Sequence, residues 1–219
     1  MTRNLRAIVL WSRRSREADK IVGLFTDGLG RLTARATSAA RPTAKFAALT
    51  EPFVECDVSL FLRPGQGWGK LVGGRILRSF PKLRTNVEKA TAASWVCEVM
   101  ARLTPEEQPS PGKFVLLSET LEALEEAKEF TVLRLAFTVR FLELAGFGLE
   151  NRTAWQELQS VDPERARRLL EEPLNSFSDT VWPDPAAKAL EMLAGSVLTD
   201  QLNRPLHVNR FRQMMGINI

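Results

Sequence analysis

The chain has 219 residues, which is enough for one large domain or two small ones with separate cores. Hydrophobic residues make up 44% and charged residues 26%, as is usual for globular proteins that are soluble in water. No stretch approaches the roughly 20 apolar residues that span a bilayer, and no small-residue cleavage site follows the first apolar segment. We therefore expect a cytoplasmic protein with no membrane contact.

The net charge of +4 hides a difference between the two halves of the chain. Residues 1–84 contain 16 Lys and Arg against 6 Asp and Glu, whereas residues 85–219 contain 14 against 20. A basic segment joined to an acidic one suggests that the first binds a polyanion and that the second has another role.

The first 80 residues have the pattern of a small β-barrel. Alternation in Phe53–Phe61 places the even-numbered residues of that segment on one apolar face. Asp27–Gly30 contains two glycines, which adopt turn conformations without a Cβ clash. Five short strands without crossover helices predict a five-stranded Greek-key OB-fold. The expected strands are residues 5–11, 20–26, 31–37, 53–61 and 68–77.

After Pro81 the apolar residues recur at helical spacing. Thr85 and Asn86 are candidate N-caps, and Gly146 is a candidate C-cap. The fold class predicted is α+β, with an OB-fold nucleic-acid-binding domain at residues 1–80 followed by an all-α domain at residues 81–219. The expected helices are residues 87–103, 114–129, 131–144, 153–160, 163–170 and 183–202.

Residues that could carry catalysis are scarce. The one histidine, His207, has no Ser or Cys constellation near it in the sequence, and no Walker-type or dinucleotide-binding glycine motif is present. Cys56 and Cys97 lie in apolar segments, which indicates buried free thiols rather than metal ligands or a disulfide. We expect a non-enzymatic protein without metal or cofactor. A nuclease that uses scattered carboxylates stays open as an alternative.

Basic residues are abundant in the expected barrel. Lys and Arg can follow a phosphate backbone while bases stack on nearby aromatic rings, for which Trp11, Phe46 and Trp68 are candidates. The three basic residues of the fifth strand are spaced so that they can share a face. The candidate DNA-binding residues are Arg13, Arg14, Arg16 and Lys20 around the first loop, Arg31, Arg35, Arg41 and Lys45 on the third strand and the loop after it, and Lys70, Arg75 and Arg78 on the fifth strand.

A series of short motifs runs through most of the chain. Phe25–Leu32 contains a Phe-Thr-x-x-x-Gly-Arg turn, Ala40–Pro42 forms a basic loop, and Ala48–Phe53 ends in Pro-Phe. Further along, Phe137–Gly148 has the form of a helix that ends in Gly-Phe-Gly, and Arg204-Pro205-Leu206 follows near the C-terminus. In this order, the motifs resemble the RecO family of recombinational DNA repair proteins.

The resemblance implies a protein that binds single- and double-stranded DNA, anneals strands and helps to load the recombinase in concert with RecR. The family's DNA-contacting loop corresponds to Arg35, Arg41 and Lys45. Its pocket for the acidic C-terminal tail of single-strand-binding protein is expected near Arg134 and Arg140. The implied location is the bacterial cytoplasm, in association with the nucleoid.

Two features depart from the family pattern. Residues 149–173 contain no cysteine, so the four-cysteine zinc module of many members is not expected here. Ser38–Ala40 stands where the family usually has Lys-Gly, which removes a positive charge from the basic loop. Simple DNA binding is therefore the primary expectation and annealing the secondary one. Two further alternatives stay open: a protein-interaction adaptor whose barrel binds no nucleic acid, and an RNA-binding barrel of unrelated lineage.

Overall fold

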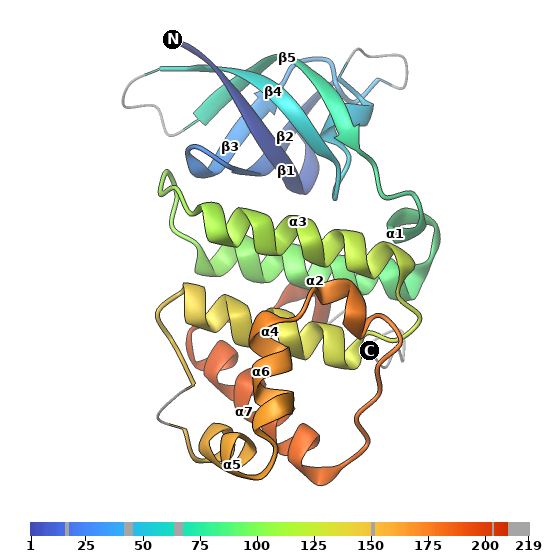
Figure 1. The fold of residues 1–219 in the computed structure, drawn as a ribbon. Helices are drawn as coiled ribbons and strands as arrows, with labels where there is room; N and C mark the ends of the chain where they lie inside the picture. The colour runs from blue at the N-terminus through green and yellow to red at the C-terminus, as the bar shows by residue number, and fades with distance from the viewer. Residues whose placement is uncertain (16–17, 42–45, 64–67, 150–151, 203, 210–219) are drawn as a thin grey trace. The chain divides into compact units, whose positions relative to one another are not determined.

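The computed structural model describes residues 1–15, 18–41, 46–63, 68–149, 152–202 and 204–209. Figure 1 shows a barrel of strands in the first part of the chain and helices in the rest. The predicted α+β class, an N-terminal barrel followed by helices, is confirmed. The chain divides into two compact units: unit 1 contains Met1–Pro81 with Cys97–Ser118, and unit 2 contains Lys82–Val96 with Glu119–Ile219.

The barrel of unit 1 closes in the strand order β1-β2-β3-β5-β4. Neighbouring strands are antiparallel except β3 and β5, which pair in parallel and complete the closure expected of a five-stranded OB-type barrel. The strands are β1 (Thr2–Ser15), β2 (Asp19–Thr26), β3 (Gly30–Ala36), β4 (Glu55–Leu62) and β5 (Trp68–Arg78).

Side chains alternate between the two faces of each strand, and those that point into the barrel are small or branched apolar residues. In the β4 segment, Val54, Cys56, Val58 and Leu60 are all at most 2% exposed, which confirms the apolar face that the alternation predicts. The β2–β3 turn is closed by Thr26, whose hydroxyl donates to the Gly30 carbonyl at 2.8 Å and accepts the Leu29 N–H at 3.1 Å. Gly30 has φ +69°, a left-handed conformation that favours glycine.

Register shifts between β4 and β5 explain how irregularly spaced cations come to one face of β5. Lys70 lies opposite Phe61, Arg75 opposite Asp57 and Arg78 opposite Glu55, with shifts at Ser59/Leu60 and Glu55/Cys56. Phe61, Asp57 and Glu55 are separated by even numbers of residues along β4, so their side chains lie on the same face of the sheet. The basic residues opposite them lie on that face as well. The shared face predicted for the basic residues of β5 is confirmed.

The helical segments agree with the sequence pattern in most of their limits, but the helix expected at residues 114–129 begins and ends three residues earlier, at Pro111 and Glu126. Gly146, with φ +80°, ends α4 in a left-handed C-cap, as expected. The last long helix begins at Pro185 rather than Pro183, because Asp184 accepts the Ala187 N–H at 3.1 Å and caps it. The helices are α1 (Lys82–Thr85), α2 (Val87–Leu103), α3 (Pro111–Glu126), α4 (Thr131–Leu144), α5 (Thr153–Val161), α6 (Pro163–Glu171) and α7 (Pro185–Asp200), with short 3-10 turns at Ala48–Thr50 and Leu174–Phe177.

The first turn of α2 follows the sequence expectation, because the Asn86 side chain accepts the Lys89 N–H at 3.0 Å. No helix in the described ranges is both long and apolar enough to span a membrane.

Candidate nucleic-acid interface

One group of barrel cations is held by a buried carboxylate. The Glu55 side chain is fully buried, and its Oε2 lies 2.6 Å from Arg78 Nη2 and accepts the Ser118 hydroxyl at 3.0 Å. Arg6 forms an ion pair with the other carboxylate oxygen. A buried carboxylate requires such partners because its desolvation is costly. Arg78 therefore has a structural role in unit 1, and the charge of Glu55 balances its own.

Four more of the predicted DNA-binding residues also have carboxylate partners. Arg35 donates to the mostly buried Asp19, with Nε 2.8 Å from Oδ2, and Asp19 also accepts the Ser38 N–H at 2.8 Å. The other three ion pairs are Arg31–Glu106 at 2.9 Å, Lys20–Glu51 at 2.7 Å and Arg75–Asp57 at 2.7 Å. These pairs are partly exposed, and each of them reduces the positive field that a polyanion meets.

A second group of barrel cations is exposed. Arg13, Arg14 and Lys70 have no ion pair with any carboxylate of the described residues, and Arg41 is exposed in the loop after β3. The Arg13 guanidinium lies 5.7 Å from the centroid of the Trp11 ring. Arg16 and Lys45, which the sequence also suggested, lie outside the described residues.

A groove of about 440 Å³ brings some of these cations together with aromatic rings. Trp68, at the start of β5, is 51% exposed, and Phe61 near the end of β4 lies under Arg63, whose guanidinium is 5.8 Å from the ring centroid. Arg35 and Lys70 complete the cationic lining. Phe61 and Arg63 were not among the candidates from the sequence, because strand pairing, rather than any local pattern, brings them beside Trp68.

The other two candidate stacking residues are less accessible. Trp11 lies opposite Gly23 on β2, and its indole occupies the space of the missing side chain, since a Cβ there would be 2.2 Å from Nε1. Phe46 packs against the core of the barrel. Among the three candidates, Trp68 is therefore the one whose ring is open to a ligand.

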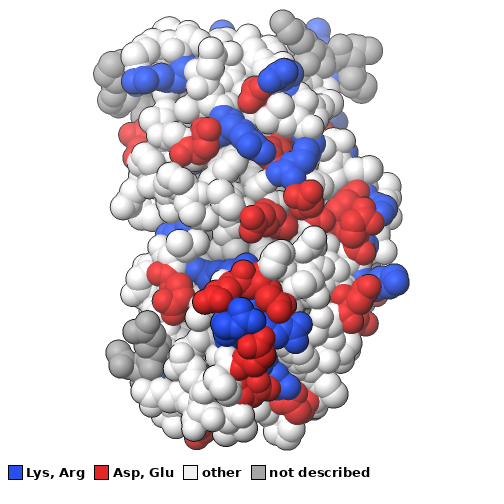
Figure 2. Space-filling model, in the orientation of Figure 1, with Lys and Arg blue, Asp and Glu red and all other residues white. Residues whose placement is uncertain are grey.

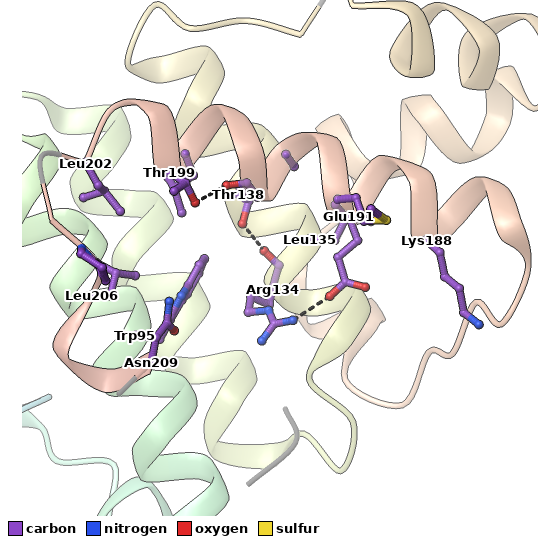
Figure 3. Close-up of a pocket in the computed structure, with 15 residues that line it drawn as sticks. Trp95, Arg134, Leu135, Thr138, Lys188, Glu191, Thr199, Leu202, Leu206 and Asn209 are labelled. Carbon is purple, nitrogen blue, oxygen red and sulfur yellow. Dashed lines mark hydrogen bonds and ion pairs between the residues drawn. The ribbon is translucent and has the colours of Figure 1, made fainter. Parts of the chain in front are cut away.

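In unit 2, a separate pocket of about 660 Å³ lies among α2, α4 and α7 (Figure 3). Arg134 points toward Glu191 across it, with Nη2 2.6 Å from Oε1, and its guanidinium lies 5.7 Å from the Trp95 ring centroid. Lys188 precedes Glu191 by three residues on α7, and leucines form much of the remaining lining. The pocket therefore combines basic groups with apolar walls.

Arg140, which the sequence analysis grouped with Arg134, has a different position. Its guanidinium donates to the carbonyl oxygens of Leu169, at 2.7 Å, and Glu172, at the C-terminal end of α6. Burial lowers the pKa of Arg140 from its ordinary value. The structure thus places Arg134 in the pocket and Arg140 at a helix end, where it satisfies carbonyls that lack helical partners.

The two cysteines are buried free thiols, as predicted. Burial, followed by the neighbouring carboxylates Asp57 and Glu55, raises the pKa of Cys56 to about 12. In the part of the chain that the structure describes, no three or more His, Cys, Asp or Glu side chains form a group that could hold a metal ion.

Comparison with known proteins adds independent findings. Residues 1–80 match the family model described as Recombination protein O N terminal, and residues 84–154 match Recombination protein O C terminal. A protein of Syntrophobacter fumaroxidans named DNA repair protein RecO is 31% identical over 219 aligned residues, covering 95% of this chain and 82% of the relative.

Two further relatives carry the same name. The protein of Geobacter metallireducens is 34% identical over 141 residues, and that of Desulforudis audaxviator is 35% identical over 144 residues. The matched stretches cover 64% and 66% of this chain and 57% of each relative's length. Both terminal family models match in order, and one relative aligns with 95% of this chain, so the chain belongs to the RecO family.

Proposed function

We propose that this protein is a non-catalytic mediator of recombinational DNA repair that binds single-stranded DNA through its barrel. The observation that carries the proposal is the set of exposed barrel cations without carboxylate partners among the described residues: Arg13, Arg14, Arg63 and Lys70. Such charges attract a phosphate backbone by releasing its counterions. The membership of the RecO family, whose relatives are named DNA repair proteins, supports the same role.

The test is fluorescence anisotropy of a labelled single-stranded oligonucleotide, titrated with the protein at several salt concentrations. Affinity should fall with salt, with a log–log slope of about −0.7 for each phosphate neutralised. Replacing Arg13 and Arg14 together should reduce that slope by about 1.4 if both contact phosphates, because both are exposed and neither has a carboxylate partner among the described residues. An unchanged slope would remove this part of the barrel from the DNA-binding surface.

Annealing of strands, loading of the recombinase and binding of RecR are further parts of the proposal, and they rest on the family alone. An annealing assay with complementary labelled strands tests the first of them. Acceleration of duplex formation by the protein at low salt is the expected result, and an unchanged rate would limit the function to binding.

We also propose that the pocket of unit 2 binds the acidic C-terminal tail of single-strand-binding protein. Arg134 and Lys188 could pair with carboxylates of the tail, and the leucine walls suit an apolar end group. A tail carboxylate would have to displace Glu191 from Arg134. Replacing Arg134 by Ala should weaken binding of a labelled tail peptide, whereas replacing the exposed Lys128, which is outside the pocket lining, should not.

A protein-interaction adaptor is the second candidate function, because many barrel cations already have carboxylate partners. Absence of binding to single-stranded DNA even at low salt would favour it. A paired titration with RNA and DNA of the same sequence tests the RNA-binding alternative, since contacts to 2′-hydroxyls give a preference for RNA.

A further inference from the structure

The barrel groove has an ordered row of outward-facing residues across three strands. Arg35 of β3 lies beside Lys70 of β5 in the parallel pair, and Lys70 lies opposite Phe61 of β4. Trp68 precedes Lys70 by two residues, so both side chains leave the strand on the same face. The pairing of strands therefore puts an aromatic ring and two cations side by side.

The exposure of Trp68 has no explanation in the packing of unit 1. Its side chain is 51% exposed, although large aromatic rings usually find apolar or base-like partners. The groove beside it has a volume of about 440 Å³, within the range of small-ligand sites, roughly 300–1,000 Å³. The lining supplies an aromatic surface and positive charge, which is the combination that a nucleotide requires.

The second aromatic ring of the groove, Phe61, has a cation beside it. Phe61 is held under the Arg63 guanidinium at 5.8 Å. Arg63 has no carboxylate partner among the residues whose positions are described, so its donors are open to a phosphate oxygen. In duplex DNA the faces of the bases are covered by their neighbours, whereas unpaired bases can stack on an exposed ring.

We propose that Trp68, with Phe61 beside it, stacks on unpaired bases while Arg63 and Lys70 hold the flanking phosphates. This inference rests on the proposed DNA-binding function and assigns the discrimination between single-stranded and duplex DNA to the groove. The cations bind both forms of DNA through phosphates, and the exposed indole adds affinity only where bases are free to stack.

The experiment compares wild-type protein with Trp68→Ala and Trp68→Phe on three ligands of equal length: a single strand, the same strand with abasic sites, and a duplex. Trp68→Ala should bind the intact strand about 5- to 150-fold more weakly, the loss typical of one base–aromatic stack. Its affinity for the abasic strand and the duplex should equal that of the wild type. Trp68→Phe should retain most of the affinity, because a phenyl ring also stacks.

Val72→Ala is the matched control, because Val72 is an exposed apolar residue of the same strand, 43% accessible, that does not line the groove. It should leave all three affinities unchanged. A measurement that does not depend on the folding of the Ala variant is tryptophan fluorescence: the intact strand should quench wild-type emission more than the abasic strand does, and Trp68→Phe should abolish the difference.

Two results of the binding experiment would overturn the inference while leaving DNA binding intact. One is wild-type affinity of Trp68→Ala for the intact strand, and the other is an equal loss on all three ligands, which indicates a structural role for the ring. Failure of the wild type to bind any of the three ligands at low salt would instead refute the proposed function itself. Identical quenching by intact and abasic strands would also overturn the stacking role.

Discussion

The two units each contain a cluster of arginine and aromatic side chains, but the clusters differ in how their charges are balanced. In unit 1 the open cluster consists of Phe61, Arg63 and Trp68. In unit 2 the closed cluster consists of Arg165, Arg168, Phe177 and Trp182. There, Arg165 lies 4.8 Å from the Trp182 ring centroid, and Phe177 meets the same ring edge-on at 6.1 Å.

Carboxylates make the difference. Arg165 Nη1 is 2.9 Å from both oxygens of Asp184, and Arg168 is 3.1 Å from Glu172, so both guanidinium groups of the closed cluster are neutralised. Figure 2 shows that acidic and basic side chains also lie side by side elsewhere on the surface of the helices. The same residue types therefore form a scaffold where carboxylates accompany them and a candidate ligand site where they do not.

The largest expected effect is a difference between the two clusters in how much the loss of a phenylalanine ring lowers the free energy of unfolding. Phe177 is fully buried, so Phe177→Ala should lower the free energy of unfolding by about 4 kcal/mol, through lost burial and the cavity left behind. Phe61 is only partly buried, and Phe61→Ala should cost about 1 kcal/mol or less. Urea denaturation followed by circular dichroism measures both. Equal losses would mean that the open cluster is structural as well.

The next largest effect is the loss of stability when the carboxylate that pairs with Arg6 and Arg78 is removed. Glu55→Gln removes the buried charge that Arg6 and Arg78 compensate and should lower the free energy of unfolding by about 2 kcal/mol, because charged hydrogen bonds are lost while the two arginines remain partly exposed to water. Glu51→Gln is the control, because the Lys20–Glu51 pair is more exposed and should be worth less than about 1 kcal/mol. A similar loss in both variants would contradict the structural role of Glu55.

A third effect tests charge without aromatic stacking. The double variant Arg63→Ala, Lys70→Ala should reduce the salt slope of single-strand binding by about 1.4. A tenfold rise in salt would then weaken binding by about 25-fold less in the variant than in the wild type. Arg165→Ala with Arg168→Ala should reduce stability and leave that slope unchanged, because these arginines are already paired. The comparison between the units would fail if the second pair lowered the slope as much as the first.

The sequence predicted the elements of this fold well because their signals are local. The alternation in β4 and the capped apolar helices α2 and α4 depend on residues close together in the chain, and their positions agree with the structure. The four-residue helix α1 and the 3-10 turns were not predicted, since such short segments have no periodicity to detect.

The candidate site was harder to predict because it depends on distant partners. Nothing in the local sequence shows that Arg35 meets Asp19 or that Arg78 meets Glu55, so paired and exposed cations were grouped together. Phe61 and Arg63 were missed for the same reason, since only the pairing of β4 with β5 brings them near Trp68. Composition predicted a basic barrel, but tertiary pairing decides which of its charges a ligand can reach.

The smallest expected effect is a pH dependence of the closed cluster. The Ala187 N–H and then Arg165 hold the pKa of Asp184 below its ordinary value of about 3.8. A carboxyl with a depressed folded pKa stabilises the fold above its unfolded pKa, and this contribution is lost as the pH falls through the folded pKa. Thermal unfolding temperatures measured from pH 5 down to pH 2 should therefore fall more steeply below about pH 3.8 for the wild type than for Asp184→Asn.

The Asn side chain can still cap α7 but has no charge to lose, so the difference between the two curves isolates what the charge of Asp184 contributes through the Ala187 N–H and Arg165. Because Asp184 is at the surface, water and salt screen this pair, and the separation should shrink as salt is added. Curves that run parallel at low salt would mean that apolar packing of Phe177 and Trp182 holds the closed cluster without help from the carboxylate. Carboxylate pairing would then not be what separates the closed cluster from the open one.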